Sequence, residues 1–369
     1  MDLELIKVLT KDLGYDPSGR DEVMRFISTG SPLLDVAISN KMDGGGVPVG
    51  RLTEIVGLES AGKSVIMAQL IANAQKMGMK CILIDTEATS DKYFLTKFGV
   101  DYEDMTRIVL ETVEDVVSCI ELVIKKYQED DDNDNSDPAK GKKKGKGSKS
   151  KRELFIGWDS VASTPSREEV ENEIEKQSMG VIPRILSKGL RKINKLVSET
   201  NTTLVFTNQL KENIGQMFGD KLVAPGGHAI KFHASARIRL NKRSEIKNAQ
   251  EQAIGIKVKA KVVKNKVAIP YREAEFDIYF NKGVNDYEYW LDILGKEKII
   301  DLGAWNKMTL PGQEEKKFRR ADWAGMCQSK EYGPYIKEQI SKIMILDDNV
   351  PINVEAVEPD EDPSTDEEE

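Results

Sequence analysis

Hydrophobic and polar residues alternate along this 369-residue chain in two periods, one typical of strands and one typical of helices. Mostly apolar runs of the strand type occupy residues 52–57, 80–85, 153–159 and 203–208. Apolar positions at the spacing of one helix face occupy residues 64–77, 113–127 and 181–200. Strands and helices in alternation predict an α/β fold in which helices cover a mostly parallel sheet.

Two further regions follow this core. Residues 237–280 consist mostly of strand-like segments, which we expect to extend the sheet at one side. After residue 285 the sequence continues with YEYWLDILGKEKIID, and we expect a small, separate α+β domain there.

Two charged segments depart from the apolar pattern. Residues 129–152 carry an acidic run and then a basic run with almost no apolar side chain, which predicts a disordered insertion loop. In one interpretation this loop is a solvated surface segment, and in another it folds back on itself or holds a phosphate backbone.

The net charge is −8, but residues 355–369 hold nine acids and no base, so the rest of the chain carries +1. The acidic end predicts a disordered tail over residues 351–369, and the remainder leaves nucleic acid open as a partner.

Composition argues against several classes of protein. No run approaches the roughly 18 uncharged apolar residues that span a bilayer, so we expect no membrane partner. The first residues, MDLELIKVLTKDLG, lack a basic-then-apolar signal pattern, so we expect the protein in the cytoplasm. The three cysteines are far apart and form no CxxC pair, which predicts reduced core side chains rather than a zinc site.

Residues 57–64 read GLESAGKS, a GxxxxGKS motif that follows a strand-like run and precedes a helical one. The glycines of such a P-loop let its backbone N–H groups close around phosphate at the start of a helix. Lys63 is expected to reach the β- and γ-phosphates, and the Ser64 hydroxyl to ligate Mg²⁺. The motif therefore predicts ATP and Mg²⁺ as cofactors. The nucleotide-binding candidates are Gly57, Leu58, Glu59, Ser60, Ala61, Gly62, Lys63 and Ser64.

Hydrolysis also needs groups that position water and magnesium, and polar residues stand at suitable strand ends. Asp159 closes the strand LFIGWD and is the candidate second magnesium contact, while Glu87 stands at the end of CILIDTE and could polarise the attacking water. Gln209 ends LVFTNQ and could sense the γ-phosphate. A carboxylate at a strand end also serves as a simple helix cap, and that interpretation stays open for each residue alone.

Beyond these motifs, the sequence resembles the RecA family of strand-exchange recombinases over most of residues 26–306. The resemblance rests on an ordered series of segments: FISTGSPLLD, GGGVPVGRLTEIVGLESAGKS, LIDTE, WDSVASTP, SMGVIPRIL, FTNQLKENIGQMFGD, GGHAIKFHASARIRL, KVVKNKVAIPYREAEF and DLGAWNKM. It implies a RecA-like P-loop ATPase core with a small C-terminal domain. The insertion at 129–152 departs from the usual bacterial members, and FRRADWAGMC with YGPYIKEQI looks more like the phage-type recombinases.

The resemblance also implies domains and catalytic roles. The expected domains are an N-terminal oligomerisation segment at 1–26, the ATPase core at 27–284, the small domain at 285–350 and the tail at 351–369.

Glu87 is implied to activate water, Asp159 to support Mg²⁺, Gln209 to couple ATP to the DNA loop after it, and Glu59 to lie near the catalytic water. Asp91 and Phe94 match adenine contacts, Phe94 replacing the frequent tyrosine. Lys264 and Lys266 match lysines that reach a neighbour's γ-phosphate.

DNA contacts and interface residues follow from the same resemblance. The family's two DNA loops correspond to about residues 171–184 and 210–227, which mix cations, apolar groups and glycine. The implied DNA-binding residues are Met179, Arg184, Arg191, Lys211, Met217, Phe218, Gly226 and Gly227. Lys231 and Phe232 match positions that transmit between neighbouring ATP sites.

The function implied is an ATP-dependent recombinase and DNA-dependent ATPase. It is expected to assemble into helical filaments on single-stranded DNA and to exchange strands with duplex DNA in recombination and repair. A single-strand-binding protein and a loader are possible further partners. A hexameric helicase, which would form a ring and use an arginine finger, and a non-enzymatic recombination mediator remain the alternatives.

Overall fold

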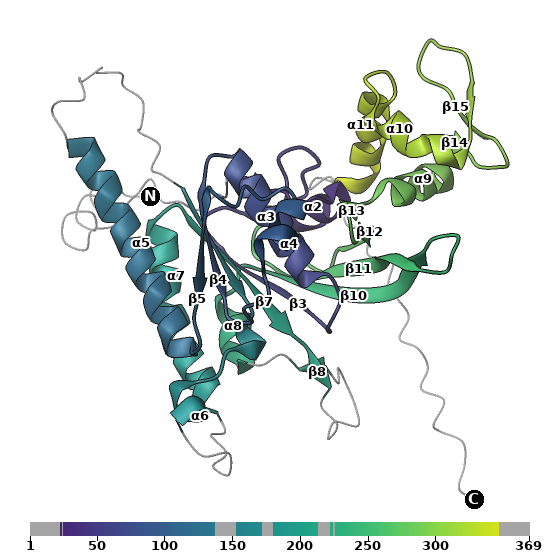
Figure 1. The fold of residues 1–369 in the computed structure, drawn as a ribbon. Coiled ribbons are helices and arrows are strands. Elements are labelled where there is room, and N and C mark those ends of the chain that lie inside the picture. Colours follow the sequence, from purple (N-terminus) through teal and green to yellow (C-terminus); the bar gives the residue numbers. More distant parts are fainter. Residues whose placement is uncertain are drawn as a thin grey trace, which may run out of the picture.

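The structure is a computed structural model that describes residues 23, 25–136, 153–171, 180–212, 222–223 and 226–346. Its centre is a nine-stranded sheet in the order β13-β12-β11-β10-β3-β7-β6-β4-β5 (Figure 1). The parallel strands are β3 (Leu52–Gly57), β4 (Lys80–Asp85), β5 (Met105–Val109), β6 (Leu154–Asp159), β7 (Thr202–Gln209) and β10 (Ala236–Lys247). The antiparallel extension consists of β11 (Ala253–Asn265), β12 (Glu273–Tyr279) and β13 (Gly283–Asn285). The α/β class and the extension of the sheet at one side are confirmed.

Helices cover both faces of the sheet (Figure 1). One face packs against α2 (Pro32–Ser39), α3 (Lys63–Lys76) and α4 (Lys92–Lys97). The other packs against α5 (Val113–Ser136), α7 (Val181–Glu199) and α8 (Gly227–His233). The two faces form separate hydrophobic clusters because alternate residues of each strand point to opposite sides, as Leu52 and Ile55 of β3 do.

The boundary of one predicted element is wrong. We expected a helix over 113–127 and a loop from 129, but α5 continues to Ser136, so the first part of the acidic run is helical. A helix that is already nucleated is easily lengthened, because each added residue gains a backbone hydrogen bond. Buried residues such as Ile120 and Ile124 anchor α5, and propagation then outweighs the weak helix propensity of Asp and Asn. Residues 137–152 lie outside the described part of the chain.

Short elements complete the chain. They are β1 (Phe26–Ile27), β2 (Val47–Pro48), α6 (Arg167–Glu171), β8 (Lys211–Glu212) and β9 (Leu222–Val223). Most of the predicted N-terminal segment 1–26 and all of the predicted tail 351–369 lie outside the described residues. Within the part of the chain that is described, no helix has the length and apolar character needed to cross a membrane.

The C-terminal region is a small α+β unit. It comprises α9 (Tyr287–Lys296), β14 (Ile300–Asp301), β15 (Asn306–Met308), β16 (Lys316–Phe318), α10 (Trp323–Gln328) and α11 (Gly333–Met344). Its buried residues, such as Trp323 and Ile336, belong to the same hydrophobic cluster as α2 and α3. Asp286, just before α9, accepts hydrogen bonds from Leu33 N (2.9 Å) and Ser31 Oγ (3.0 Å) at the start of α2. The unit is therefore attached to the α/β core by apolar packing and by an external cap on α2.

Candidate nucleotide-binding site

The GxxxxGKS motif forms the turn between β3 and α3, as its position in the sequence predicts. Gly62 has φ +91°, and a Cβ there would lie 2.3 Å from Ile278 Cδ1. A Cβ on Gly57 would lie 2.6 Å from the Leu240 carbonyl oxygen. Gly62 therefore requires glycine chiefly for its backbone angle, and Gly57 for lack of space beside the backbone of Leu240.

Helix α3 begins at this loop without a side-chain cap on its first turn. The first N–H groups of a helix have no partner within the helix, so they remain available to a bound anion. Lys63 lies in this first turn, and its ammonium donates to the carbonyls of Gly57 (3.1 Å) and Leu58 (2.8 Å). Burial lowers the pKa of Lys63, while Asp159, Glu87 and Glu59 oppose that change. The loop thus gathers N–H groups and one cation in a concave anion site.

Ser64 and Asp159 lie together beneath the loop, although they come from α3 and β6. The Asp159 carboxylate accepts hydrogen bonds from the hydroxyls of Thr207 and Ser64. Burial raises the pKa of Asp159, and the two hydroxyls counteract that rise. A carboxylate beside a hydroxyl provides the hard oxygen atoms that Mg²⁺ prefers, so these residues fit that ion. Among the described residues no group of three His, Cys, Asp or Glu side chains gathers as a metal site.

Glu87 follows β4 on a turn that buried polar contacts hold in place. Asp85 accepts from the backbone N–H of Glu87 (3.1 Å) and of Ser90 (2.9 Å), and it pairs with Arg107 (2.7 Å). The carboxylate of Glu87 is exposed and accepts a hydrogen bond from Ser160 Oγ (2.6 Å). Since β4 and β6 are neighbours, Glu87 and Asp159 lie at the same edge of the sheet. Sequence reasoning did not single out Asp85 or Arg107, which position this turn.

Gln209 is the last residue of β7 and lies directly beside Gly57, the last residue of β3. The backbone N–H of the following residue, Leu210, donates to the Gly57 carbonyl oxygen (3.0 Å). The residue that we expected to sense the γ-phosphate therefore lies next to the start of the P-loop. The chain then enters β8, the beginning of the second loop implied to bind DNA.

A cavity of about 380 Å³ opens beside the P-loop and is lined by Ser60, Gly62, Lys63, Ser64 and Val65. The predicted adenine contact Phe94 lines the same cavity. Asp91 instead caps α4, because its carboxylate accepts from Phe94 N (2.7 Å), and so it fixes the ring's position. Sequence reasoning missed four lining residues, which come from β10, β11 and the region of β12: Lys242, Ile256, Ile278 and Phe280.

Lys264, Lys266, Lys231 and Phe232 do not line this cavity. They gather toward the amino ends of β3 and β10. Lys264 lies opposite Arg237, near the start of β10, in the strand pairing of β11 with β10, and Lys266 N donates to Ser235 O (2.9 Å), just before β10. Arg237 in turn lies beside Glu54, three positions before Gly57, which corresponds to roughly 10 Å along the strand. The Lys264 ammonium donates to the carbonyls of Lys231 and Phe232 at the end of α8. Lys264, Lys266, Lys231 and Phe232 thus form one group, here called the Lys264 cluster, which lies away from the subunit's own P-loop.

The residues implied to bind DNA are only partly described. Arg184, Arg191 and Lys211 are exposed cations on α7 and β8. Gly226 is buried with φ +89° at the start of α8, and Gly227 is the first residue of that helix. Met179, Met217 and Phe218 lie outside the described residues.

One comparison with known proteins identifies a family. The chain matches the family model described as the RecA N-terminal domain over residues 12–130 and 149–285. The match covers more than half of the chain and includes the P-loop, the strand-end residues and the Lys264 cluster. Its gap, residues 131–148, falls within the predicted insertion.

Proposed function

Because the chain belongs to the RecA family, we propose that it is an ATP-dependent DNA recombinase that forms helical filaments on single-stranded DNA and exchanges strands with a homologous duplex. Family membership supports a RecA-like recombinase and a DNA-dependent ATPase in general. The observation that carries the specific proposal is the geometry of the sheet. One end holds a phosphate-binding loop with two strand-end carboxylates, and the Lys264 cluster lies toward the other.

In the proposed ATP site, the N–H groups at the start of α3 bind the phosphates, and Lys63 leaves the carbonyls of its own loop to reach the β- and γ-phosphates. Ser64 and Asp159 are the residues that would hold Mg²⁺, which would neutralise phosphate charge. Glu87, oriented by Ser160, accepts the proton of the attacking water, and Glu59 lies near that water. Phe94 packs against the adenine, with Asp91 holding it in place.

The active site is proposed to be shared between subunits. Lys264 and Lys266 lie too far along the sheet to serve their own P-loop, so they are assigned to the γ-phosphate of a neighbour. Phe232 supports this assignment, because its ring is 71% exposed beside these lysines. Lys231 and Phe232 would then transmit a structural change at one ATP site to the ATP site of the neighbouring subunit.

DNA is proposed to bind along α7 and β8 through Arg184, Arg191 and Lys211, together with the loop residues Met179, Met217, Phe218, Gly226 and Gly227. Cations neutralise phosphates, while apolar side chains contact the bases of a single strand. Action in the cytoplasm, a role in repair, a phage origin, and cooperation with a single-strand-binding protein and a loader are parts of the same proposal.

Electron microscopy of the protein with single-stranded DNA and a slowly hydrolysed ATP analogue tests the proposal. We expect regular helical filaments that require both DNA and nucleotide. Closed rings would instead identify a helicase, and dispersed particles a mediator. Mixing supplies a second test: Lys264→Ala and Lys63→Ala subunits, each inactive alone, should together recover part of the ATP turnover. Absence of recovery at every mixing ratio would contradict the shared site.

A further inference from the structure

A second polar cluster is buried inside the sheet, on the face that packs against α7 and α8. Its centre is Glu54, which is fully buried on the central strand β3. Glu54 forms an ion pair with Arg237 of β10 and accepts a hydrogen bond from the side-chain amide of Asn208 on β7 (3.0 Å). Burying an ion pair costs free energy of desolvation that the pairing often only offsets. Stability alone therefore gives little reason for this cluster.

The partners of Glu54 lie next to residues of both functional regions. Asn208 directly precedes Gln209 at the P-loop end of β7. Arg237 lies opposite Lys264 in the antiparallel pairing of β10 with β11. Lys264 in turn binds the last carbonyls of α8. Side-chain contacts and strand pairings thus form a continuous series from Gln209 to the Lys264 cluster, with Glu54 in the middle.

Charge explains why an acid belongs at this place. Arg191, Lys264 and Lys266 lie near His233 at the end of α8, and Arg237 lies near Lys264. Burial, Lys266 and Arg237 lower the pKa of Lys264, and Glu54 opposes them. Burial also lowers the pKa of His233 on α8, and Arg191, Lys264 and Lys266 lower it further. Glu54 thus attracts cations that otherwise repel one another.

We propose that Glu54 is a positioning residue that couples the two functional regions of the sheet. It contacts both Asn208, the residue before Gln209, and Arg237, which lies opposite Lys264, so that a shift of β7 when Gln209 meets a γ-phosphate moves the lysines offered to a neighbouring subunit. Two sites are coupled when both bias the same arrangement of packed groups, and the Glu54 cluster is such an arrangement. The inference rests on the proposed function, which assigns the roles of Gln209 and Lys264.

Two variants test the coupling. Glu54→Gln keeps the shape but leaves the charge of Arg237 unopposed. The double variant Glu54→Gln/Arg237→Gln removes both charges and so avoids an unpaired buried cation. The matched control is Thr53→Val, since Thr53 is the buried neighbour on the same strand and points to the other face. All three are compared with the wild type in thermal unfolding, affinity for a fluorescent ATP analogue without DNA, and ATP turnover with and without single-stranded DNA.

We expect both Glu54 variants to bind the ATP analogue within about twofold of the wild type, because the P-loop is intact. Their DNA-stimulated turnover at saturating ATP should fall at least ~10-fold, a factor worth about 1.4 kcal/mol of coupling. The control should keep both properties. A Glu54 variant that folds and retains DNA-stimulated turnover within twofold would overturn the inference, as would a loss of nucleotide affinity that parallels the loss of turnover. If neither folds, Arg237→Lys takes their place: lysine keeps the positive charge but lacks the planar guanidinium that contacts Glu54, so DNA-stimulated turnover should fall while nucleotide affinity is kept. Normal turnover in that variant overturns the inference.

The wild type separates this inference from the function on which it rests. A wild-type protein without DNA-stimulated turnover would contradict the proposed recombinase before any variant is compared. A normal wild type with normal Glu54 variants would contradict only the coupling.

Discussion

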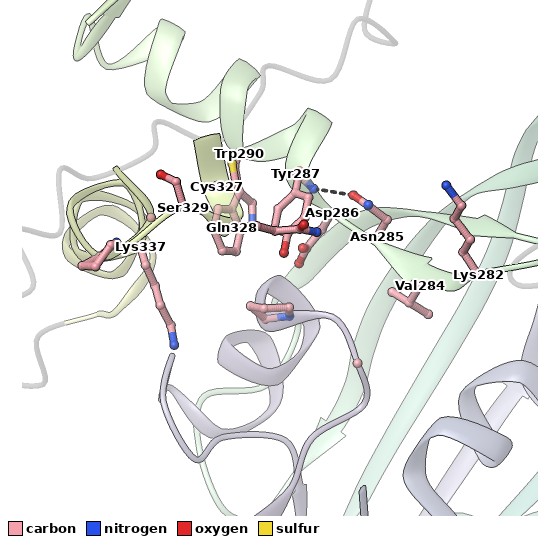
Figure 2. Close-up of a pocket in the computed structure, with 14 residues that line it drawn as sticks. Lys282, Val284, Asn285, Asp286, Tyr287, Trp290, Cys327, Gln328, Ser329 and Lys337 are labelled. Carbon is pink, nitrogen blue, oxygen red and sulfur yellow. Dashed lines mark hydrogen bonds between the residues drawn. The ribbon is translucent and has the colours of Figure 1, made fainter. Parts of the chain in front are cut away.

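Two cavities lined by residues that the structure describes differ in size, and the smaller one contains the predicted phosphate-binding groups. The cavity beside the P-loop measures about 380 Å³ and contains Lys63, Ser64 and the uncapped start of α3. The other measures about 710 Å³ and lies between the turn before α2 and the C-terminal helices, with Lys282 and Lys337 at its two sides (Figure 2). Volume alone would select the second cavity.

The difference lies in what the buried carboxylate, the lysines at the two loops and the helix start contact. In the larger cavity, the buried Asp286 accepts from Ser31 and Leu33, and Lys337 pairs with Asp43. These contacts hold the C-terminal unit on the core. In the smaller cavity, the N–H groups at the start of α3 have no side-chain cap, and Lys63 binds only carbonyl oxygens of its own loop. A binding site is thus recognised by groups that a ligand can satisfy better than the protein does.

The largest expected effect is that of Lys63→Ala, which removes the only cation of the P-loop residues 57–64. Charge-assisted contacts to phosphate contribute about 1.5–3 kcal/mol each, so nucleotide affinity should fall ~100-fold or more. Titration with a fluorescent ATP analogue measures this. As a control, Lys337→Ala at the larger cavity should leave the affinity unchanged. Equal losses in the two variants would erase the distinction between the cavities.

Glu87→Gln should separate binding from chemistry. The amide cannot accept the proton of water, so ATP turnover should fall ~10²–10⁴-fold. Affinity for the nucleotide should stay within a few-fold, because the P-loop is unchanged. Steady-state turnover and nucleotide titration on the same preparation provide the two numbers. Rapid hydrolysis by the variant would remove Glu87 from the catalytic role.

Gly62→Ala should lower both the stability of the protein and its affinity for nucleotide, because it strains the backbone of the P-loop. Alanine is strained at φ +91°, and its Cβ would collide with Ile278. Such strain costs about 1–3 kcal/mol, which corresponds to a lower unfolding temperature and a weaker nucleotide complex. Gly78→Ala is the matched control, since Gly78 also has positive φ but nothing lies within 4 Å of its Cβ position. If the two variants bind nucleotide equally well, crowding at Gly62 plays no part.

The smallest effect on nucleotide binding is expected for a change at the larger cavity, which should alter only the pH dependence of stability. Burial raises the pKa of Asp286 to about 6 from 3.8. Between these values the folded protein binds the proton more tightly than the unfolded chain, so stability falls as the pH rises from about 4 to 6. Asp286→Asn cannot titrate, and its stability should fall less over that window, by at most ~3 kcal/mol.

Thermal unfolding of both proteins at several pH values measures this difference. Burial also raises the pKa of Asp35 to about 7, and the charge of Asp286 adds to that rise, so the variant should also show a smaller change in the titration of Asp35. Nucleotide affinity should be the same for both. Identical pH profiles would show that Asp286 is not the titrating group.

Much of this arrangement could be predicted from the sequence, because local signals carry it. The P-loop, Glu87, Asp159 and Gln209 all stand at the ends of apolar runs, and parallel strands bring such ends to one edge. Phe280 and Lys242 could not be found in this way, since they reach the nucleotide cavity from strands about 180 or more residues further along the chain. Glu54 was missed because it stands within an apolar run, where its partners Asn208 and Arg237 are visible only in three dimensions.

Because the P-loop and the Lys264 cluster lie at different ends of the sheet, each subunit has two different contact surfaces and is therefore polar. With the proposed shared site, subunits join head to tail, and an interface of this kind that does not close produces an open helix rather than a ring. At one end of such a row a P-loop has no lysine donor, and at the other the lysines have no P-loop to serve. The number of complete ATP sites is then one fewer than the number of subunits. Turnover per subunit therefore rises with length, so this enzyme's specific activity would measure how long its assemblies are.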